Sequence, residues 1–346
     1  MDLRPNSLYG LDLDDAQKIF TGYGEPVYRA RQILEWLYHH HVESWNEISN
    51  LPGSLLEKLK SAFQIKSLSL KEVVPSPHGQ STKFLFETGD RHLLESVLIS
   101  REDRFTVCVS TQLGCKMKCV FCASGKSFER SLAPGEIVEQ VAWIEKNLGK
   151  RVTNVVFMGM GEPLDNFEAT LKALRILQAD WGFGLGARRI TVSTVGITPK
   201  IEEFVKRTDG KVRLSISLHS TKEQKRTELV PVNRHHSLAG LSKTLGELYR
   251  KLKREITFEY TLMEDVNDSE EEARGILRMA KPLSAKVNLI PYNPIREADF
   301  RRPSIKRIEA FRNILAKGGL RITVRQTAGR DIDAACGQLR LDRKKN

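Results

Sequence analysis

The stretch that decides the fold is Cys115-Lys116-Met117-Lys118-Cys119-Val120-Phe121-Cys122, in which the cysteines have the spacing C-x3-C-x2-C. It stands just after residues 105–109, whose β-branched and aromatic side chains predict a strand. Three thiolates on one short loop can hold three irons of a four-iron cluster and leave the fourth iron open to a ligand that is not protein. Structural zinc usually takes four closed ligands, often as two separated pairs. The triplet therefore favours an iron–sulfur cluster over zinc.

A regular alternation of strands and helices begins at residue 104. The expected strands are 105–109, 154–158, 189–193, 212–217, 256–260, 287–290 and 321–324. Amphipathic helices separate them, such as the one in which leucines recur at helical spacing over 238–252. This alternation predicts an α/β fold whose parallel sheet, with right-handed crossovers, wraps into a partial (β/α)6 barrel. Ligands of such sheets bind at the carboxyl ends of the strands.

Further regions flank this barrel. We divide the chain into an N-terminal helical accessory domain at 1–64, a β-hairpin extension at 65–103, the barrel at 104–330, and a segment at 331–346 that carries a cysteine and a basic tail. The first region shows apolar residues at helical spacing and is either a helical cap or an RNA-positioning module. In the second, residues 83–86 and 94–99 flank a turn at 88–90 and predict paired strands. We expect the basic tail to be mobile.

The charge balance of the chain is strongly basic. It has 346 residues, 55 of them Lys or Arg and 43 Asp or Glu, which gives a formal net charge of +12. Such a surplus is compatible with a polyanionic partner such as a nucleic acid, because Lys and Arg displace counterions from phosphates. Many basic proteins bind nothing acidic, however, and the charge alone decides neither way. No apolar run approaches the roughly 20 residues that span a bilayer, and the first residues contain no apolar signal core. We therefore expect a cytoplasmic protein without a membrane partner.

Two of the five cysteines, Cys108 and Cys336, lie outside the triplet. An odd number of cysteines in a cytoplasmic chain argues against a structural disulfide framework and for metal binding or catalysis. From the sequence alone, Cys108 alternates with valines and could be a small strand residue. Cys336 stands in a loop beside Gly337 and is as readily a spectator as a nucleophile.

The cysteine triplet and Phe121 before its last cysteine resemble the radical S-adenosylmethionine (SAM) superfamily. Longer blocks resemble the RlmN/Cfr family of RNA adenine methyltransferases within it. These blocks are CVSTQLGC at 108–115, FMGMGEPL at 157–164, SLH at 217–219, NLIPYNP at 288–294 and DIDAACGQL at 331–339. The resemblance implies a radical SAM barrel with a [4Fe-4S] cluster on Cys115, Cys119 and Cys122. It also implies SAM as cosubstrate, with two molecules used per turnover.

The resemblance further implies a route to a ring carbon. Carbon-2 of adenine lies between two nitrogens and is electron-poor, so a methyl cation cannot be transferred to it but a carbon radical can add. Cys336 would first accept a methyl group from one SAM. A 5′-deoxyadenosyl radical from the second would remove hydrogen from that methyl group, and the methylene radical would add to the adenine. Cys108 would then attack the sulfur of Cys336, forming a disulfide and releasing the RNA. Glu95 matches the position of the base that removes the ring proton.

The same resemblance implies a set of cosubstrate contacts. They are Gly161, Glu162, Ser193, Ser217, Leu218, His219 and Asn293. The glycine permits close approach of the backbone to a ligand, and the carboxylate after it could pair with the ammonium of SAM. Without the resemblance, the serines and Asn293 are ordinary polar residues at strand ends, and Glu95 is a solvated carboxylate. The histidines at 39–41 predict a solvated helix end rather than a metal tract.

Several finer expectations concern the substrate. Pro163 resembles the branch that methylates carbon-2, whereas Ser131 departs from the commonest family pattern in the loop after the cluster. The resemblance implies 23S rRNA as substrate, an anticodon-loop adenine of tRNA as a second one, flavodoxin or ferredoxin as electron donor, and a monomer. The alternatives are methylation of carbon-8 of the same rRNA adenine, as in the Cfr branch, and a non-catalytic zinc protein that binds RNA.

Overall fold

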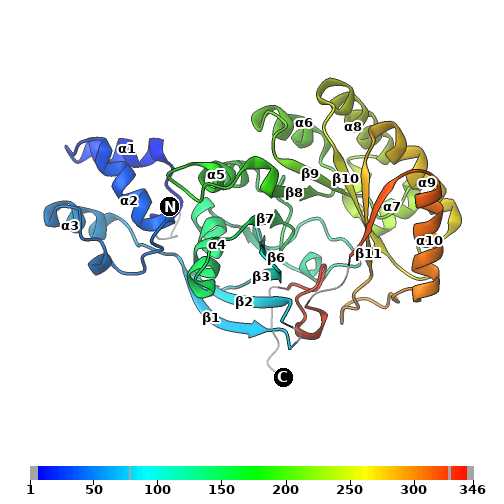
Figure 1. The fold of residues 1–346 in the computed structure, drawn as a ribbon, viewed down its shortest axis with the longest axis horizontal. Helices are drawn as coiled ribbons and strands as arrows, with labels where there is room; N and C mark the ends of the chain where they lie inside the picture. Colours follow the sequence, from blue (N-terminus) through cyan, green and yellow to red (C-terminus); the bar gives the residue numbers. More distant parts are fainter. Residues whose placement is uncertain (1–6, 78, 326–328, 341–346) are drawn as a thin grey trace.

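A computed structural model describes residues 7–77, 79–325 and 329–340 of the chain (Figure 1). Its main sheet has the strand order β1-β2-β3-β4-β7-β8-β9-β10-β11-β12. These strands are β1 (Leu68–Pro75), β2 (Ser81–Thr88), β3 (Leu93–Arg101), β4 (Arg104–Val109), β7 (Asn154–Phe157), β8 (Ile190–Thr194), β9 (Arg213–Ser217), β10 (Ile256–Leu262), β11 (Lys286–Pro291) and β12 (Arg321–Val324). The expectations for residues 1–6 and for the basic tail at 341–346 lie outside the described residues.

The helices follow the strands in the order that the sequence predicts. They are α1 (Leu13–Gly22), α2 (Tyr28–Tyr38), α3 (Gly53–Ala62), α4 (Pro134–Leu148), α5 (Phe167–Gln178), α6 (Thr198–Arg207), α7 (Glu223–Leu229), α8 (Leu238–Leu252), α9 (Glu270–Ala280) and α10 (Ile305–Lys317). Figure 1 shows α1 to α3 as a separate group beside α4 and α5, with α6, α8, α9 and α10 outside the later strands.

The pairing of the strands confirms the α/β fold with a partial barrel. From β4 to β12 each strand pairs in parallel with the next in the sheet, and helices lie between them in the chain. The strands contribute side chains such as Val155, Val192 and Leu289, none of them exposed, to a continuous apolar core. β-branched and leucine side chains on strands buried between two layers are the pattern expected of a parallel sheet covered by helices.

The β-hairpin region continues the sheet past the barrel. β1, β2 and β3 pair antiparallel in sequence, and β3 pairs antiparallel with β4, the first barrel strand. Alternate residues of a strand point to the same face, so Glu95 shares a face with Val97 and Ile99, both of which line the barrel cavity. The extension therefore supplies one wall of the barrel interior.

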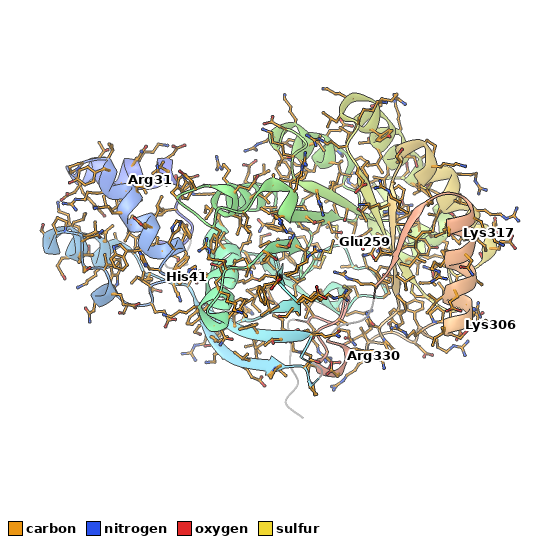
Figure 2. All side chains as sticks on the ribbon, viewed as in Figure 1. Arg31, His41, Glu259, Lys306, Lys317 and Arg330 are labelled. Carbon is orange, nitrogen blue, oxygen red and sulfur yellow. The ribbon has the colours of Figure 1, made fainter. Side chains whose placement is uncertain are left out.

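Segments that flank the N-terminal helices are held to α4 by polar contacts. Glu139 on α4 accepts hydrogen bonds from the Ser7 hydroxyl at 2.7 Å and from the Leu68 amide at 2.7 Å. His41 is buried and its Nε2 lies 2.8 Å from Glu145 Oε2 (Figure 2). The expectation of a solvated helix end thus holds for His39 and His40, which are exposed, and is wrong for His41. The cause is the turn after α2, which directs His41 against α4.

None of the described helices is long and apolar enough to cross a membrane.

Candidate active site

The cysteine triplet lies on a loop that is held in shape where its two ends approach closely, at Gly114 and Ser127. The loop connects β5 (Gln112–Gly114) and β6 (Phe128–Ser131), which pair as a short ribbon. Gly114 has φ +78°, and a Cβ there would lie 2.0 Å from the carbonyl oxygen of Ser127. The amide of Cys115 donates a 2.8 Å hydrogen bond to that same carbonyl. Only glycine fits this approach, so the local sequence fixes where the first thiol stands.

The three thiols are close enough to influence one another. Burial raises the pKa of Cys119 well above its ordinary value, and the neighbouring Cys115 and Cys122 raise it further. Burial also raises the pKa of Cys122, while hydrogen bonds from Ser124 and Gly125 oppose that rise. Thiols whose deprotonation is disfavoured in the metal-free protein become ligands when a cation is present to stabilise the thiolates.

The donor set fits a cluster better than a single ion. The loop offers three cysteine thiols, at positions 115, 119 and 122. A cluster takes each thiolate on a different iron, so its ligands need not converge on a single position as the ligands of zinc must. The three neighbouring thiols of this loop, of which Cys119 is buried, therefore fit a four-iron cluster with one open iron.

Glu162 lies on the turn after β7 with both carboxylate oxygens held. It is buried, and it accepts hydrogen bonds of 3.0 Å from the amides of Leu164 and Val195. Burial raises the pKa of this carboxyl group to about 7, although those hydrogen bonds oppose the rise. Gly161 before it has φ +98°, and a Cβ there would lie 2.6 Å from the Gln112 side chain. A desolvated carboxylate on a rigid turn can pair with a cation.

The carboxyl ends of β8 and β9 bring together two serines that we expect to contact the cosubstrate. The hydroxyls of Ser193 on β8 and Ser217 on β9 lie 3.5 Å apart. Leu218 is buried, and its carbonyl accepts a 3.0 Å hydrogen bond from Nε of Arg226 on α7. The Arg226 guanidinium also donates to the carbonyls of Val195 and Ser217. This buried arginine ties the ends of the two strands together.

His219 directly contacts the loop that carries the three cysteines. Its ring packs edge-on against Phe121 with centroids 4.6 Å apart, and its Nδ1 accepts a 3.0 Å hydrogen bond from the Thr261 amide. Burial lowers the pKa of this imidazole to about 3, and the charge of Arg226 lowers it further. His219 is therefore neutral at physiological pH with its proton on Nε2. Its contacts place it as a support of the loop that carries the triplet.

The segment after β12 carries Cys336 to the barrel interior. Asn293, just beyond β11, donates a 3.1 Å hydrogen bond to the carbonyl of Cys336. Cys108, Cys122, Asn293 and Cys336 all line one cavity of 880 Å³. All the described cysteines are free thiols, so Cys108 and Cys336 face the same cavity without being bonded. Glu162, Ser193 and Ser217 lie outside the lining of this cavity.

Glu95 is tied to the same C-terminal segment. It is buried, pairs with the ammonium of Lys83 at 3.2 Å, and accepts a 3.1 Å hydrogen bond from the Arg340 amide. Lys83 also donates to the carbonyl of Asp333 at 3.3 Å. The default expectation of a solvated carboxylate is wrong, because the segment on either side of Cys336 covers this part of β3. Residues on both sides of Cys336 in the chain thus contact this carboxylate or its lysine partner.

Three polar residues that sequence reasoning missed complete the site. Gln112 accepts a 2.9 Å hydrogen bond from the Glu162 amide, Arg226 joins the ends of β8 and β9, and Arg325 donates a 2.9 Å hydrogen bond to the sulfur of Cys336. Gln112 lies inside the first family-like block, which could have drawn attention to it. The two arginines carry no local signal, because arginine in a sequence is expected to be exposed.

Comparison with known proteins gives two matches to family models. The model of the radical SAM superfamily matches residues 109–275. A model described as the ribosomal RNA large subunit methyltransferase N-terminal domain matches residues 6–65. The first match contains the cysteine triplet and the strands around it, and the second contains the N-terminal helices.

Whole-chain relatives agree with these matches. The "Probable dual-specificity RNA methyltransferase RlmN" of Clostridium botulinum (strain Alaska E43 / Type E3) is 42% identical, over 91% of this chain and 91% of the relative. The "Dual-specificity RNA methyltransferase RlmN" of Marinomonas sp. (strain MWYL1) is 42% identical, over 98% of this chain and 94% of the relative. The crystal structure of a radical SAM methyltransferase from Sphaerobacter thermophilus is 40% identical, with a TM-score of 0.92, over 98% of this chain and all of that one.

Proposed function

Because the chain belongs to the RlmN family of radical SAM RNA methyltransferases, we propose that it methylates carbon-2 of an adenine in 23S rRNA and an anticodon-loop adenine of tRNA. The observation that carries the proposal is the meeting of Cys108, Cys336 and the triplet residue Cys122 at one cavity. This reaction needs three kinds of cysteine: one that carries the methyl group, one that releases the methylated RNA from it, and those that hold the cluster.

Cys115, Cys119 and Cys122 would hold the [4Fe-4S] cluster. When bound, the cluster supplies the electron that cleaves SAM into methionine and a 5′-deoxyadenosyl radical. Cys119 and Phe121 are buried, and their burial would exclude water from this step and protect a reactive species from side reactions. Arg226 adds a buried positive charge, which lowers the pKa of Cys119 against the effect of burial.

The residues at the strand ends would orient the cosubstrate. Glu162 would accept the ammonium group of SAM, and Gly161 would allow the backbone to approach it. Four further residues stand at or just past the carboxyl ends of β8, β9 and β11, where ligands of parallel sheets bind: Ser193, Ser217, Leu218 and Asn293. His219 would contribute from the same edge. Two molecules of SAM per turnover would use this position in succession.

Cys336 would carry the methyl group as a thioether, and Cys108 would release the product by bonding to its sulfur. The structure has both as free thiols lining one cavity, which is the arrangement that such an exchange requires before turnover. Glu95 would accept the proton from the adenine ring at its carboxylate. Lys83 gives this carboxylate a buried ion-pair partner at 3.2 Å.

One residue favours methylation of carbon-2 over methylation of carbon-8. Pro163 follows Glu162 in the turn after β7, as in the carbon-2 branch.

The relatives in Clostridium botulinum and Marinomonas are named as dual-specificity enzymes, which supports two RNA substrates. Flavodoxin or ferredoxin would supply electrons, and the active form would be a monomer. The non-catalytic zinc alternative has no support in a family of methyltransferases.

Mass spectrometry of RNA nucleosides tests the proposal. Ribosomal and transfer RNA from a strain that lacks the gene would be digested and compared with RNA from the same strain carrying it again. We expect 2-methyladenosine in both RNAs only when the gene is present. The appearance of 8-methyladenosine would place the chain in the other branch, and unchanged nucleosides would reject RNA methylation by this protein.

A further inference from the structure

The cavity that holds Cys108 and Cys336 extends to the amino-terminal ends of the barrel strands. On β4 the residues Arg104, Thr106 and Cys108 all line it, because alternate residues of a strand share a face. At a rise of about 3.3 Å per residue, the backbone of Arg104 stands about 13 Å from that of Cys108. Arg104 is exposed, so the cavity has a mouth at this end. The segment that carries Cys336 lines the opposite end.

Short polar side chains leave the space between this mouth and the cysteines open. The interior of a closed barrel is normally filled by layers of bulky branched side chains. Here six strands direct hydroxyl or amide groups into the cavity, from Thr106, Thr191, Ser215, Thr257, Asn288 and Thr323. The cavity volume of 880 Å³ falls within the roughly 300–1,000 Å³ of sites that hold small molecules. A polar space of small-molecule size therefore joins the mouth to the cysteines.

The mouth carries positive charge that no carboxylate offsets. Five exposed arginines line it, namely Arg101, Arg104, Arg188, Arg213 and Arg254. The ion pairs described there join Lys211 to Asp209 at 3.1 Å and Lys286 to Glu255 at 2.7 Å, and no described ion pair includes one of the five arginines. Partial burial lowers the pKa of Arg104, and the like charges of neighbouring arginines, most strongly Arg213, lower it further.

The charges deeper in the cavity are balanced. Arg325 and the buried carboxylate of Glu259, which Figure 2 labels, both line the cavity near the cysteines. The excess charge therefore lies at the mouth. Cations at the entrance of a cleft with low-dielectric walls focus the field and raise the local concentration of anions. The mouth is thus suited to admit a small anion, and the half-buried thiol of Cys108 lies on the strand face that leads inward from it.

We propose that this arginine-lined mouth admits a small anionic thiol that reduces the disulfide between Cys108 and Cys336 after each turnover. The proposal rests on the disulfide proposed above. The thiolate of the reductant attacks the sulfur of Cys108, and the bond to Cys336 breaks with its electron pair on the Cys336 sulfur. A second thiolate attacks the reductant sulfur of the mixed disulfide and frees Cys108. Each cysteine takes a proton from solvent, to which the two thiols gave theirs, so two thiols become one disulfide and two electrons enter the protein.

Thiol reagents of similar size and different charge test the entry route without turnover. The cluster-loaded protein, without SAM or RNA, would be treated anaerobically with methanethiosulfonates that carry a sulfonate, a hydroxyl or a trimethylammonium group. Peptide mass spectrometry would follow the modification of Cys108. Arg104→Glu and Arg213→Glu would be compared with the unaltered chain and with the matched control Arg278→Glu. Arg278 is an exposed arginine on α9 and does not line the cavity.

Each substitution at the mouth should slow the reaction of Cys108 with the sulfonate reagent by about tenfold at low ionic strength. It should leave the reaction with the hydroxyl reagent unchanged and accelerate that with the trimethylammonium reagent. Salt at about 1 M should remove most of these differences, because the Debye length falls there to about 3 Å. Arg278→Glu should change none of the three rates.

A second measurement follows the reductive step itself. After a single turnover with RNA, the protein would be separated from the RNA and treated with anionic 2-mercaptoethanesulfonate or neutral 2-mercaptoethanol. The return of free Cys108 and Cys336 would be followed by mass spectrometry. Arg104→Glu should slow the reduction by the anionic thiol about tenfold and leave the reduction by the neutral thiol unchanged.

Unchanged rates with the sulfonate reagent in folded Arg104→Glu and Arg213→Glu proteins would overturn the proposal, and thermal unfolding shows whether each variant is folded. Equal changes with all three reagents would also overturn it, because that result means that only the width of the cavity has changed. A disulfide that the anionic thiol reduces equally fast in Arg104→Glu would reject the proposal and leave the proposed function intact. A charge-dependent Cys108 in a protein that forms no disulfide after turnover would reject the release step of the proposed function, and the reductive role with it, and leave only the entry route.

Discussion

The amide of Asn293 donates a 3.1 Å hydrogen bond to the backbone carbonyl of Cys336. One residue at the end of β11 thus reaches the segment that carries the methyl acceptor, and it is also a predicted contact of the cosubstrate. Arg302 donates to the amide oxygen of Asn293 at 3.2 Å, which fixes the orientation of that amide. The barrel edge and the C-terminal segment are therefore positioned by a common side chain.

Asn293→Asp should slow the methylation of Cys336. The change places a carboxylate oxygen against the Cys336 carbonyl, so a hydrogen bond becomes a repulsion. The loss of a buried hydrogen bond is worth about 1–3 kcal/mol, which corresponds to a decrease of roughly 5-fold to 150-fold in rate. The mass of the Cys336 peptide after timed incubation with SAM measures this rate. Asn313→Asp, on the exposed side of α10, should leave the rate unchanged.

Cys108→Ala should trap RNA on the protein. Without the second thiol nothing attacks the Cys336 sulfur after the adduct has formed, so a covalent protein–RNA species accumulates. Denaturing electrophoresis with labelled RNA detects it, and digestion with ribonuclease should remove the label. Cys336→Ala should give neither adduct nor product. Normal turnover by Cys336→Ala would mean that the methyl group does not pass through this residue.

The binding of SAM should weaken as the pH falls below about 7. Burial raises the pKa of Glu162 to about 7, so the group becomes neutral below that pH and loses its attraction for an ammonium ion. Far below the pKa, affinity should decrease about tenfold per pH unit. Equilibrium dialysis of the cluster-loaded protein measures this. Glu162→Gln should bind weakly at every pH, and a variant that kept the original pH dependence would assign it to another group.

Gly114→Ala should prevent assembly of the cluster. The new Cβ would lie 2.0 Å from the Ser127 carbonyl oxygen at a φ of +78°, so the loop must move away from β6. Strain and overlap together should cost more than about 2 kcal/mol of stability. Gly149→Ala is the matched control, since φ is +66° there and nothing lies within 4 Å of the added carbon. It should cost about 1 kcal/mol and retain iron. Equal iron content in both variants would show that the close contact between Gly114 and the Ser127 carbonyl is not needed for cluster assembly.

The sequence predicts the barrel well because strands buried on both faces leave a local pattern. Residues 154–158 and 287–290 are recognisable as strands from their β-branched content, and β7 and β11 lie there. The strand expected at 189–193 lies one residue later, at Ile190–Thr194, because a short 3-10 turn ends at Arg189. Periodicity identifies an element better than it places the ends of that element.

The candidate site could be predicted only in part. The triplet and Cys336 carry local signals, whereas the burial of Glu95 depends on Lys83 from another strand and on Arg340 from the far end of the chain. Arg226 and Arg325 are charged residues whose partners are carbonyls 8 to 31 residues away and a sulfur 11 residues away. Burying a charge is unfavourable unless such partners exist, and a single sequence does not show which partners the fold supplies.

The most direct test is to measure 5′-deoxyadenosine after anaerobic reconstitution of the protein with iron and sulfide and reduction in the presence of SAM. We predict a brown protein with about four irons per chain that forms 5′-deoxyadenosine, and a Cys119→Ser variant that forms none. A colourless protein with tightly bound zinc, or an iron-loaded one that leaves SAM intact, would contradict the account.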